Sequence, residues 1–325
     1  MDNLQLIERL NSARKQLYRE IGHVIIGQRE ILEHLFLAML CQGHVLLEGV
    51  PGLAKTLIIK TLAEVLDLSF SRIQFTPDLM PSDITGTEII QETKAGGRKF
   101  KFFRGPIFAN IILADEINRT PPKTQAALLE AMQEHRVTAA GISYTLDEPF
   151  FVMATQNPIE QEGTYPLPEA QLDRFMFKLR IKYPSREEEL QIVETTTGAP
   201  GAVPSKAVNR ADVLAFQELI RQVPVAENVI EYAVDLVRHT RPGQDRQPEF
   251  IREWVEWGAG PRASQYLILG AKALAAMDGR PTPDVADVTI LVKPVMRHRI
   301  ITNFNAEAEG ISTDQILDRL VESRS

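Results

Sequence analysis

The chain has 325 residues, of which 24% are charged and 44% hydrophobic, and its formal net charge is −7. This length predicts one large and one small domain, because single hydrophobic cores stop growing at roughly 250–300 residues. The acidic balance disfavours nucleic acid as a partner, the lone Cys41 excludes an intramolecular disulfide and a cysteine-based zinc cluster, and no apolar run approaches the ~20 residues of a membrane span.

The first 20 residues predict an amphipathic helix, with Leu4, Ile7 and Leu10 on one side. This segment lacks the basic stretch followed by an apolar block that marks a signal peptide, so we expect a cytoplasmic protein. A short β-branched stretch and then a helix over residues 29–42 follow.

A tight turn between a strand and a helix is the segment around which the chain is organised. The apolar run 44–48 leads into Gly49-Val50-Pro51-Gly52-Leu53-Ala54-Lys55-Thr56, and Leu57 continues into a helix-forming stretch. Such a turn directs backbone N–H groups and a helix N-terminus at one point, which favours phosphate. Lys55 is expected to contact the β- and γ-phosphates, and Thr56 to offer its hydroxyl to Mg²⁺.

Ala54 departs from this phosphate-binding pattern, which has a second glycine at its position. We expect alanine to exclude any backbone conformation that only glycine tolerates. A chance Gly/Pro turn is the alternative to a phosphate-binding loop, and the flanking strand and helix together with Lys55-Thr56 argue against it.

Apolar residues just upstream of a phosphate-binding loop are typical of an adenine-contacting wall. Val24, Ile25 and Ile26 occupy that place in the chain. The residues alone favour plain core packing equally.

A loop-rich excursion follows the predicted second strand, residues 70–75. Strand-like stretches at 87–91 and 98–102 flank a turn at 94–97, which predicts a protruding hairpin over about 84–105. Long insertions in an α/β core more often have a function than not, although a solvated insertion without a function is the alternative.

Two carboxylates end the next buried strand. Residues 109–114 are continuously apolar, as in a strand covered on both faces, and Asp115-Glu116 follow directly. Carboxyl ends of parallel strands meet at the ligand-binding edge of an α/β sheet, beside the phosphate-binding loop. We expect Asp115 to hold the metal, directly or through water, and Glu116 to act as general base toward an attacking water.

Another buried strand, residues 150–155, is predicted to deliver Asn157 to the same edge. Between the two strands lie a helix over 120–134 and a second hairpin over about 135–146. The amide of Asn157 could orient a water against the γ-phosphate, or it could serve turn chemistry before Pro158.

The last predicted strand, residues 177–183, is preceded by Arg174, which is either a surface ion-pair partner or a group that acts on a second subunit. Sequence patterns typical of strands end near residue 184, where we place the domain boundary. The remainder is predicted to be helical. Arg262 lies at a predicted helix N-terminus, where the dipole disfavours a cation, so a bound phosphate would explain it.

These motifs together resemble the AAA+ ATPases and, within them, the MoxR family, over essentially the whole chain. Alanine is usual at the position of Ala54 in that family. The segment 113–119 resembles its Walker B motif, 155–158 its sensor 1, 167–175 the segment with its arginine finger, and 260–263 its sensor 2. The resemblance also places residues 24–27 against adenine.

The resemblance implies an α/β fold with an αβα P-loop NTPase core over residues 1–184, built on a five-stranded parallel sheet. A linker and a small all-α lid domain make up 185–325. It further implies a hexameric ring, hairpin tips that face a central pore, and a chaperone-like remodeller. Its partners would be a protein client and often a protein with a von Willebrand factor A domain.

The expected activity is Mg²⁺-dependent ATP hydrolysis at subunit interfaces. Asn157 would position the water, Arg262 would sense the γ-phosphate from the lid of the same subunit, and Arg174 would enter from the neighbour. A nucleic-acid motor is a rival function, favoured by Arg98, Lys99 and Lys101 on one hairpin. A metal-chelatase motor subunit and an ATP-binding switch that hardly hydrolyses are the other two.

Overall fold

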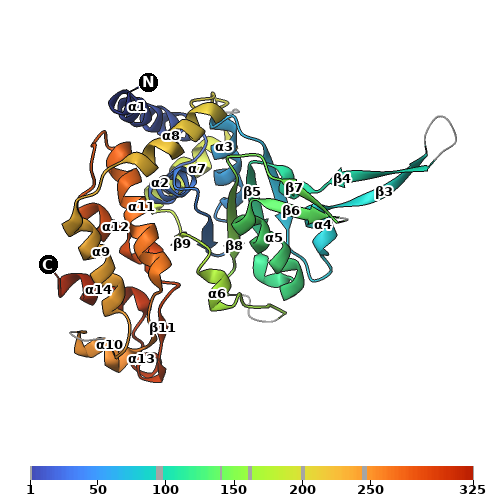
Figure 1. Ribbon diagram of the computed structural model, residues 1–325. Helices are drawn as coiled ribbons and strands as arrows, with labels where there is room; N and C mark the ends of the chain where they lie inside the picture. Colours follow the sequence, from blue (N-terminus) through green and yellow to red (C-terminus); the bar gives the residue numbers. More distant parts are fainter. Residues whose placement is uncertain are drawn as a thin grey trace.

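The core of the protein is a five-stranded parallel sheet sandwiched between helices (Figure 1). The computed structural model describes residues 2–92, 98–139, 141–159, 163–198, 202–243 and 247–324. The sheet strands are β1 (Val45–Glu48), β2 (Phe70–Gln74), β5 (Ile111–Asp115), β8 (Phe151–Gln156) and β9 (Phe177–Arg180). Their spatial order is β2-β5-β8-β1-β9, and every neighbouring pair is parallel. This confirms the predicted fold class.

Alternate side chains of the central strands enter two separate apolar cores, as the period of a strand requires. On one side, Leu46, Ile112 and Val152 pack with α5 (Pro122–Glu134). On the other side, Leu47 and Leu113 pack with helices α1 (Asn3–Ile21), α2 (Arg29–Leu40) and α3 (Lys55–Val65). Burial on both faces explains why these strands are continuous apolar runs.

The C-terminal region is helical apart from one short antiparallel ladder, β10 (Val255–Trp257) with β11 (Ile301–Thr302). Its helices are α8 (Arg210–Gln222), α9 (Glu227–His239), α10 (Glu249–Trp254), α11 (Pro261–Met277), α12 (Val285–Met296), α13 (Phe304–Glu309) and α14 (Thr313–Glu322). The apolar core around α1 and α2 continues into this region without a break. The lid therefore packs directly on the core of its own chain.

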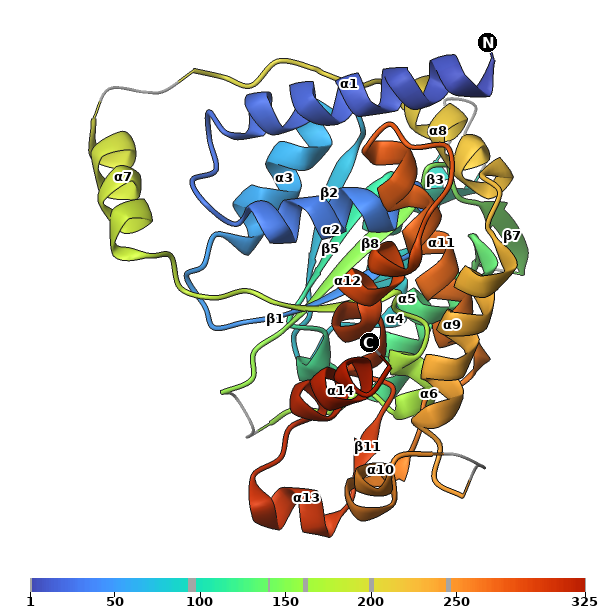
Figure 2. The same ribbon diagram turned by 90° about the vertical axis from the view of Figure 1, so that its left-hand side faces the viewer.

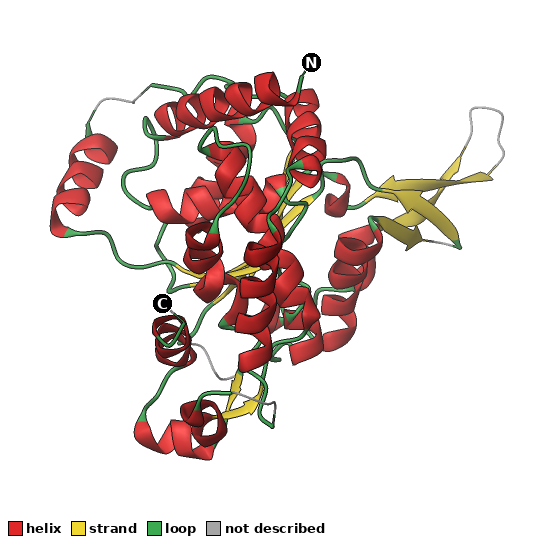
Figure 3. Ribbon diagram, turned by 60° about the vertical axis from the view of Figure 1, so that its left-hand side comes forward, coloured by secondary structure: helices red, strands yellow, loops and turns green. Residues whose placement is uncertain are grey.

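Two hairpins project from the opposite side of the molecule (Figures 1 and 3). The first pairs β3 (Gly86–Glu92) with β4 (Arg98–Arg104), and the second pairs β6 (Arg136–Ala139) with β7 (Ile142–Thr145). Both were predicted, although the turn at 94–97 lies outside the described residues. The short helices α4 (Pro81–Thr85) and α6 (Glu169–Leu172) and the single turns η1 (Pro106–Phe108) and η2 (Ile117–Arg119) lie in the connections.

Helix α7 (Arg186–Thr197) stands away from the body of the molecule and buries none of its residues (Figure 2). Its first turn carries three glutamates, and the Ser185 hydroxyl accepts a hydrogen bond from the Glu188 backbone at 3.2 Å, which caps the N-terminus of the helix.

Candidate functional site

The turn after β1 forms a loop whose backbone can receive phosphate. Gly49 is required by close approach, since a Cβ there would lie 2.1 Å from Cγ2 of Ile181. The Lys55 ammonium donates to the Gly49 carbonyl at 2.6 Å across the loop. Helix α3 begins at Lys55, so the N-terminus of α3 follows the loop directly.

Ala54 adopts a left-handed backbone conformation, with φ 54° and ψ 22°, as the N-cap of α3. This region is open to other residues as well as to glycine, and Gln28, Gln42 and His135 also adopt it, so our expectation that alanine excludes glycine-only conformations is not contradicted. Left-handed backbone crowds the Cβ against the following carbonyl and costs a non-glycine residue roughly 1–2 kcal/mol. Packing around the loop must offset that cost.

The predicted acidic pair lies at the carboxyl end of β5. Thr155 on the neighbouring strand β8 joins the two acids: its hydroxyl donates to Oδ1 of Asp115 at 2.7 Å and accepts from the Glu116 backbone N–H at 2.9 Å. Glu116 itself has φ 58°, a conformation rare outside glycine and typical of functional positions. Thr155 was not predicted as a site residue, although a hydroxyl in an otherwise apolar strand was its visible signal.

Strand β2 supplies two further polar contacts that sequence reasoning missed. Arg72 donates to Oδ2 of Asp115 at 2.6 and 3.1 Å, and Gln74 donates to Oε2 of Glu116 at 2.9 Å. Arg119 also pairs with Oε2 of Glu116 at 2.9 Å. Both acids are thus hydrogen-bonded to side chains of their own chain.

Asn157 is buried just past the end of β8, whose Gln156 lies beside Glu48 of β1 in the sheet register. The structure therefore brings Asn157 to the sheet edge that also carries the loop and the acids. Its side-chain oxygen accepts from the Ile159 backbone at 3.2 Å, which is the turn chemistry considered as the alternative.

The donor set at this edge fits a magnesium ion. Thr56 offers a hydroxyl and Asp115 a carboxylate, and Mg²⁺ is usually held by one or two such hard oxygens together with phosphate and water. Within the part of the chain that the structure describes, no group of three or more histidine, cysteine, aspartate or glutamate residues could hold a metal alone. A metal here would depend on the nucleotide for its remaining ligands.

Arg174 and Arg262 lie together at the opposite edge of the sheet. The Met176 backbone donates to the His44 carbonyl at 2.8 Å, just before β1 begins. Arg174 donates to the Leu129 carbonyl at 3.0 Å, and Arg262 pairs with Asp173 at 3.0 Å. Both arginines line one cavity of about 210 Å³, with Gln42, His44, Met132, Gln133, His135 and Tyr266.

This placement argues against our expectation that Arg262 acts on the nucleotide of its own subunit. The loop follows the carboxyl end of β1, whereas Arg262 faces the amino end, and four strand residues at ~3.3 Å each separate the two edges. Arg262 does lie at the N-terminus of α11, as predicted, but Asp173 compensates its charge there.

The proposed adenine wall is part of the core. Ile25 is buried in the apolar cluster and Val24 packs against it, while Ile26 is half-buried. The core alternative thus holds for Ile25.

The two hairpins pack on each other and expose apolar side chains. Phe102 of β4 stacks on Tyr144 of β7 with ring centroids 4.4 Å apart. Farther along the first hairpin, Ile90 and Phe100 are paired across the strands and are 57% and 65% exposed.

Comparison with known proteins decides the family. Residues 44–177 match the ATPase family associated with various cellular activities (AAA), and residues 250–320 match the AAA lid domain. The chain is 44% identical to Chaperone MoxR1 of Mycobacterium tuberculosis over 94% of its own length and 80% of that protein. The chain belongs to the MoxR family of AAA+ ATPases.

Other relatives of this MoxR-family chain agree. Protein MoxR of Paracoccus denitrificans is 28% identical, over 86% of each chain. A crystal structure of a Cytophaga hutchinsonii protein, assigned there as an ATPase, superposes with a TM-score of 0.91 at 43% identity and covers 98% of this chain and 96% of that one. None of the helices in the described parts of the chain is long and apolar enough to cross a membrane.

Proposed function

We propose that this MoxR-family chain hydrolyses ATP with Mg²⁺ at sites shared between two copies of itself, arranged as a hexameric ring. The observation that carries the proposal is the distance within one chain between the phosphate-binding residues and the two arginines. The phosphate loop and the acids lie at one edge of the sheet, and the arginines Arg174 and Arg262 lie at the other. One chain therefore holds two half-sites, and a neighbour must complete each of them.

Within one half-site, the backbone of residues 49–57 and the Lys55 ammonium would bind the phosphates, with the half-buried Val24 and Ile26 on the adenine side. Thr56 and Asp115 would hold the metal, which when bound neutralises phosphate charge. Glu116 would take a proton from the attacking water, which Asn157 would orient. In the structure, Oε2 of this carboxylate accepts hydrogen bonds from Gln74 and Arg119.

The neighbouring chain would supply the cations. Arg174 is the expected arginine finger, and the cavity that it shares with Arg262 implies that both enter from the same neighbour. A finger supplied in trans contributes roughly 10³–10⁵ in rate in related phosphoryl transfers. Hydrolysis should therefore require assembly.

The test is Arg174→Ala. The variant should bind ATP with unchanged affinity, since the loop of its own chain is intact, and should lose at least roughly 10³ in turnover. Normal turnover by an assembled Arg174→Ala ring would refute the shared site. A matched control is Arg186→Ala, which changes an exposed arginine in the first turn of α7.

We infer that the ring remodels a protein client together with a partner that carries a von Willebrand factor A domain. The apolar side chains exposed on the hairpins, Ile90 and Phe100 among them, support contact with protein. Glu116→Gln should bind ATP without hydrolysing it, and proteins that co-elute with it in ATP but not in ADP identify the client. Recovery of nucleic acid instead would favour the motor rival, for which Arg98 and Lys101 offer exposed cations.

A further inference from the structure

A single carboxylate links two lid arginines beside the finger. Oδ2 of Asp173 pairs with Arg262 at 3.0 Å, and Oδ1 pairs with Arg299 at 2.7 Å. Asp173 precedes Arg174 in the chain, while Arg262 lies in the first turn of α11 and Arg299 follows α12. Three elements distant in sequence therefore meet at the residue next to the finger.

Arg299 holds the main chain on both sides of Arg174. Its guanidinium donates to the carbonyls of Asp173 at 2.8 Å, Phe175 at 2.7 Å and Met176 at 3.3 Å, and also to that of Val295. Its side chain is 2% exposed. A planar fork with five donors suits such a set of oxygens, which a single ammonium could not span.

Tyr266 of α11 completes the enclosure. Its ring lies 5.2 Å from the Arg299 guanidinium, and its hydroxyl approaches the Arg174 carbonyl at 3.4 Å. Burial raises the pKa of this hydroxyl, so it stays protonated and can donate. The backbone of Arg174 is thus fixed by lid residues, while its side chain lies in the cavity shared with Arg262.

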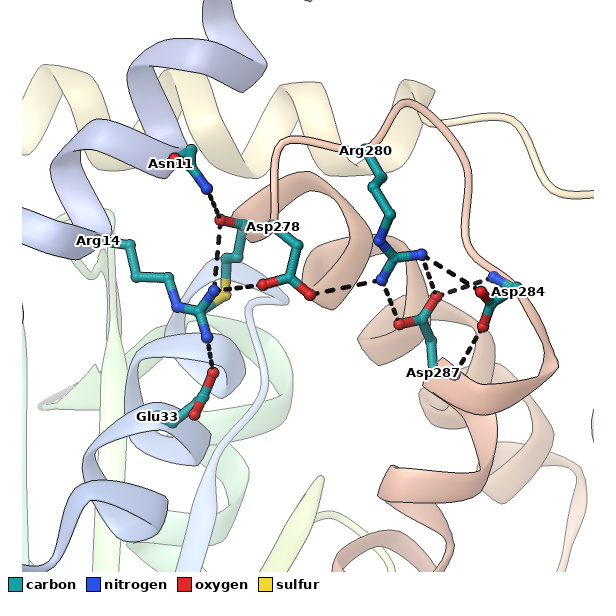
Figure 4. A network of polar contacts seen from close by, with 8 residues as sticks. Asn11, Arg14, Glu33, Asp278, Arg280, Asp284 and Asp287 are labelled. Atoms are coloured by element: carbon teal, nitrogen blue, oxygen red, sulfur yellow. Dashed lines mark hydrogen bonds and ion pairs between the residues drawn. The ribbon is translucent and has the colours of Figure 1, made fainter.

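The other end of α11 is anchored to the core as well (Figure 4). Arg14 of α1 pairs with Glu33 of α2 and, at 2.5 Å, with Asp278, which caps α11. Asn11 donates to the Met277 carbonyl at 2.7 Å. Helix α11 is therefore held at both ends, and the lid is expected to move with the core of its own chain.

We propose that Arg299 is a positioning residue for ATP hydrolysis in the neighbouring subunit. Through Asp173 and the carbonyls around Arg174, it fixes Arg174 and Arg262 as one preassembled pair of cations for the neighbour's phosphates. This inference rests on the proposed shared site. Asp173 is shared by Arg262 and Arg299, so the three arginines with this one carboxylate keep a net positive charge that a phosphate can use.

The test is Arg299→Lys, which keeps the charge and loses the fork. Its ATP affinity should stay within about two-fold of wild type, because its own loop is untouched, while turnover falls by roughly 10-fold or more. Asp173→Asn should behave in the same way if the lysine variant folds poorly. Arg297→Lys is the matched control, since Arg297 also docks the lid on β9, through the Lys178 carbonyl at 3.1 Å, without contacting Asp173.

Mixing subunits separates positioning from mere folding. Glu116→Gln cannot hydrolyse but carries intact arginines, so each variant is mixed with it in equal amounts. Arg174→Ala and Arg299→Lys should both recover turnover, toward about a quarter of the wild-type value per chain when copies mix at random in a ring. A double variant, Glu116→Gln with Arg299→Lys, should rescue neither.

Two outcomes are distinguishable failures. If Arg174→Ala is not rescued by mixing, the shared site itself is wrong. If Arg174→Ala is rescued but Arg299→Lys either turns over normally alone or is not rescued, the positioning role of Arg299 is overturned.

Discussion

Acid should destabilise this protein through His44, a fully buried histidine at the amino end of β1. Its Nδ1 accepts the Val152 backbone N–H at 3.1 Å, and its Nε2 lies 3.1 Å from the Met132 carbonyl. Both contacts fit the neutral ring with the proton on Nε2. Burial lowers the pKa of His44 from 6.5 to about 4.

The sign and size of the effect follow from this difference in pKa. Below pH 6.5 the unfolded chain protonates His44 while the folded chain does not, so the free energy of unfolding falls by ~1.4 kcal/mol per pH unit. The loss ends near pH 4, where the folded state also protonates. Over that window it amounts to roughly 3 kcal/mol.

Other histidines also contribute to the pH dependence of the free energy of unfolding. Burial also lowers the pKa of His34 and His298, which steepens the same loss. A hydrogen bond that His135 donates to the Glu148 carboxylate raises the pKa of His135, so the stabilisation from this contact is lost as pH rises above the ordinary value of 6.5. A comparison with a His44 variant cancels the contributions of His34 and His298, and it leaves only the change in His135 that follows from losing its neighbour His44, 6.4 Å away between ring centroids.

The assay is denaturant unfolding of wild type and His44→Asn between pH 7.5 and 4.5. Asparagine can place an acceptor near Val152 N–H but does not titrate. Wild type should be the more stable protein at pH 7.5, and its advantage should shrink steadily below pH 6.5. Parallel stability curves for the two proteins would refute the reasoning.

Three further substitutions test the site. Ala54→Gly relieves the strain of a left-handed backbone, although the greater conformational freedom of glycine in the unfolded chain offsets part of the gain. The free energy of unfolding should rise by up to ~1 kcal/mol, and ATP affinity should be retained. A destabilised variant would contradict this. Thr155→Val leaves Asp115 and Glu116 each short of a hydrogen bond, so it should lose ~1–3 kcal/mol of stability and most turnover while still binding fluorescent nucleotide. Arg72→Ala removes a half-exposed cation that pairs with Asp115 and competes with a metal for its carboxylate. The Mg²⁺ concentration for half-maximal turnover should therefore fall by roughly two- to five-fold. An increase would show that Arg72 supports the metal site.

The pattern of apolar and polar residues along the chain was sufficient to predict the sheet and the edge at which the candidate ligand-binding residues gather. Continuous apolar runs ending in Asp115 and Asn157 mark strands buried on both faces, and parallel strands bring their carboxyl ends to one edge. The roles of Lys55, Thr56, Asp115 and Glu116 remain predictions, now with a geometry that fits them.

Contacts that depend on strand register or lid packing were not predictable. Arg72 and Gln74 meet the acids only because β2 pairs with β5 in a particular register. The ion pairs of Arg262 and Arg299 with Asp173 depend on how α11 and α12 dock on the core. The hydrophobic periodicity of a helix does not predict that docking. For that reason the sequence could not show that Arg262 lies away from the phosphate loop of its own chain.

The central claim is that two copies build each ATPase site, and turnover per chain as a function of protein concentration tests it most directly. The assembled fraction is measured in parallel by sedimentation. We predict that turnover per chain rises in step with assembly, while the unassembled chain still binds fluorescent ATP. Constant turnover per chain at concentrations where sedimentation finds only monomer would contradict the account.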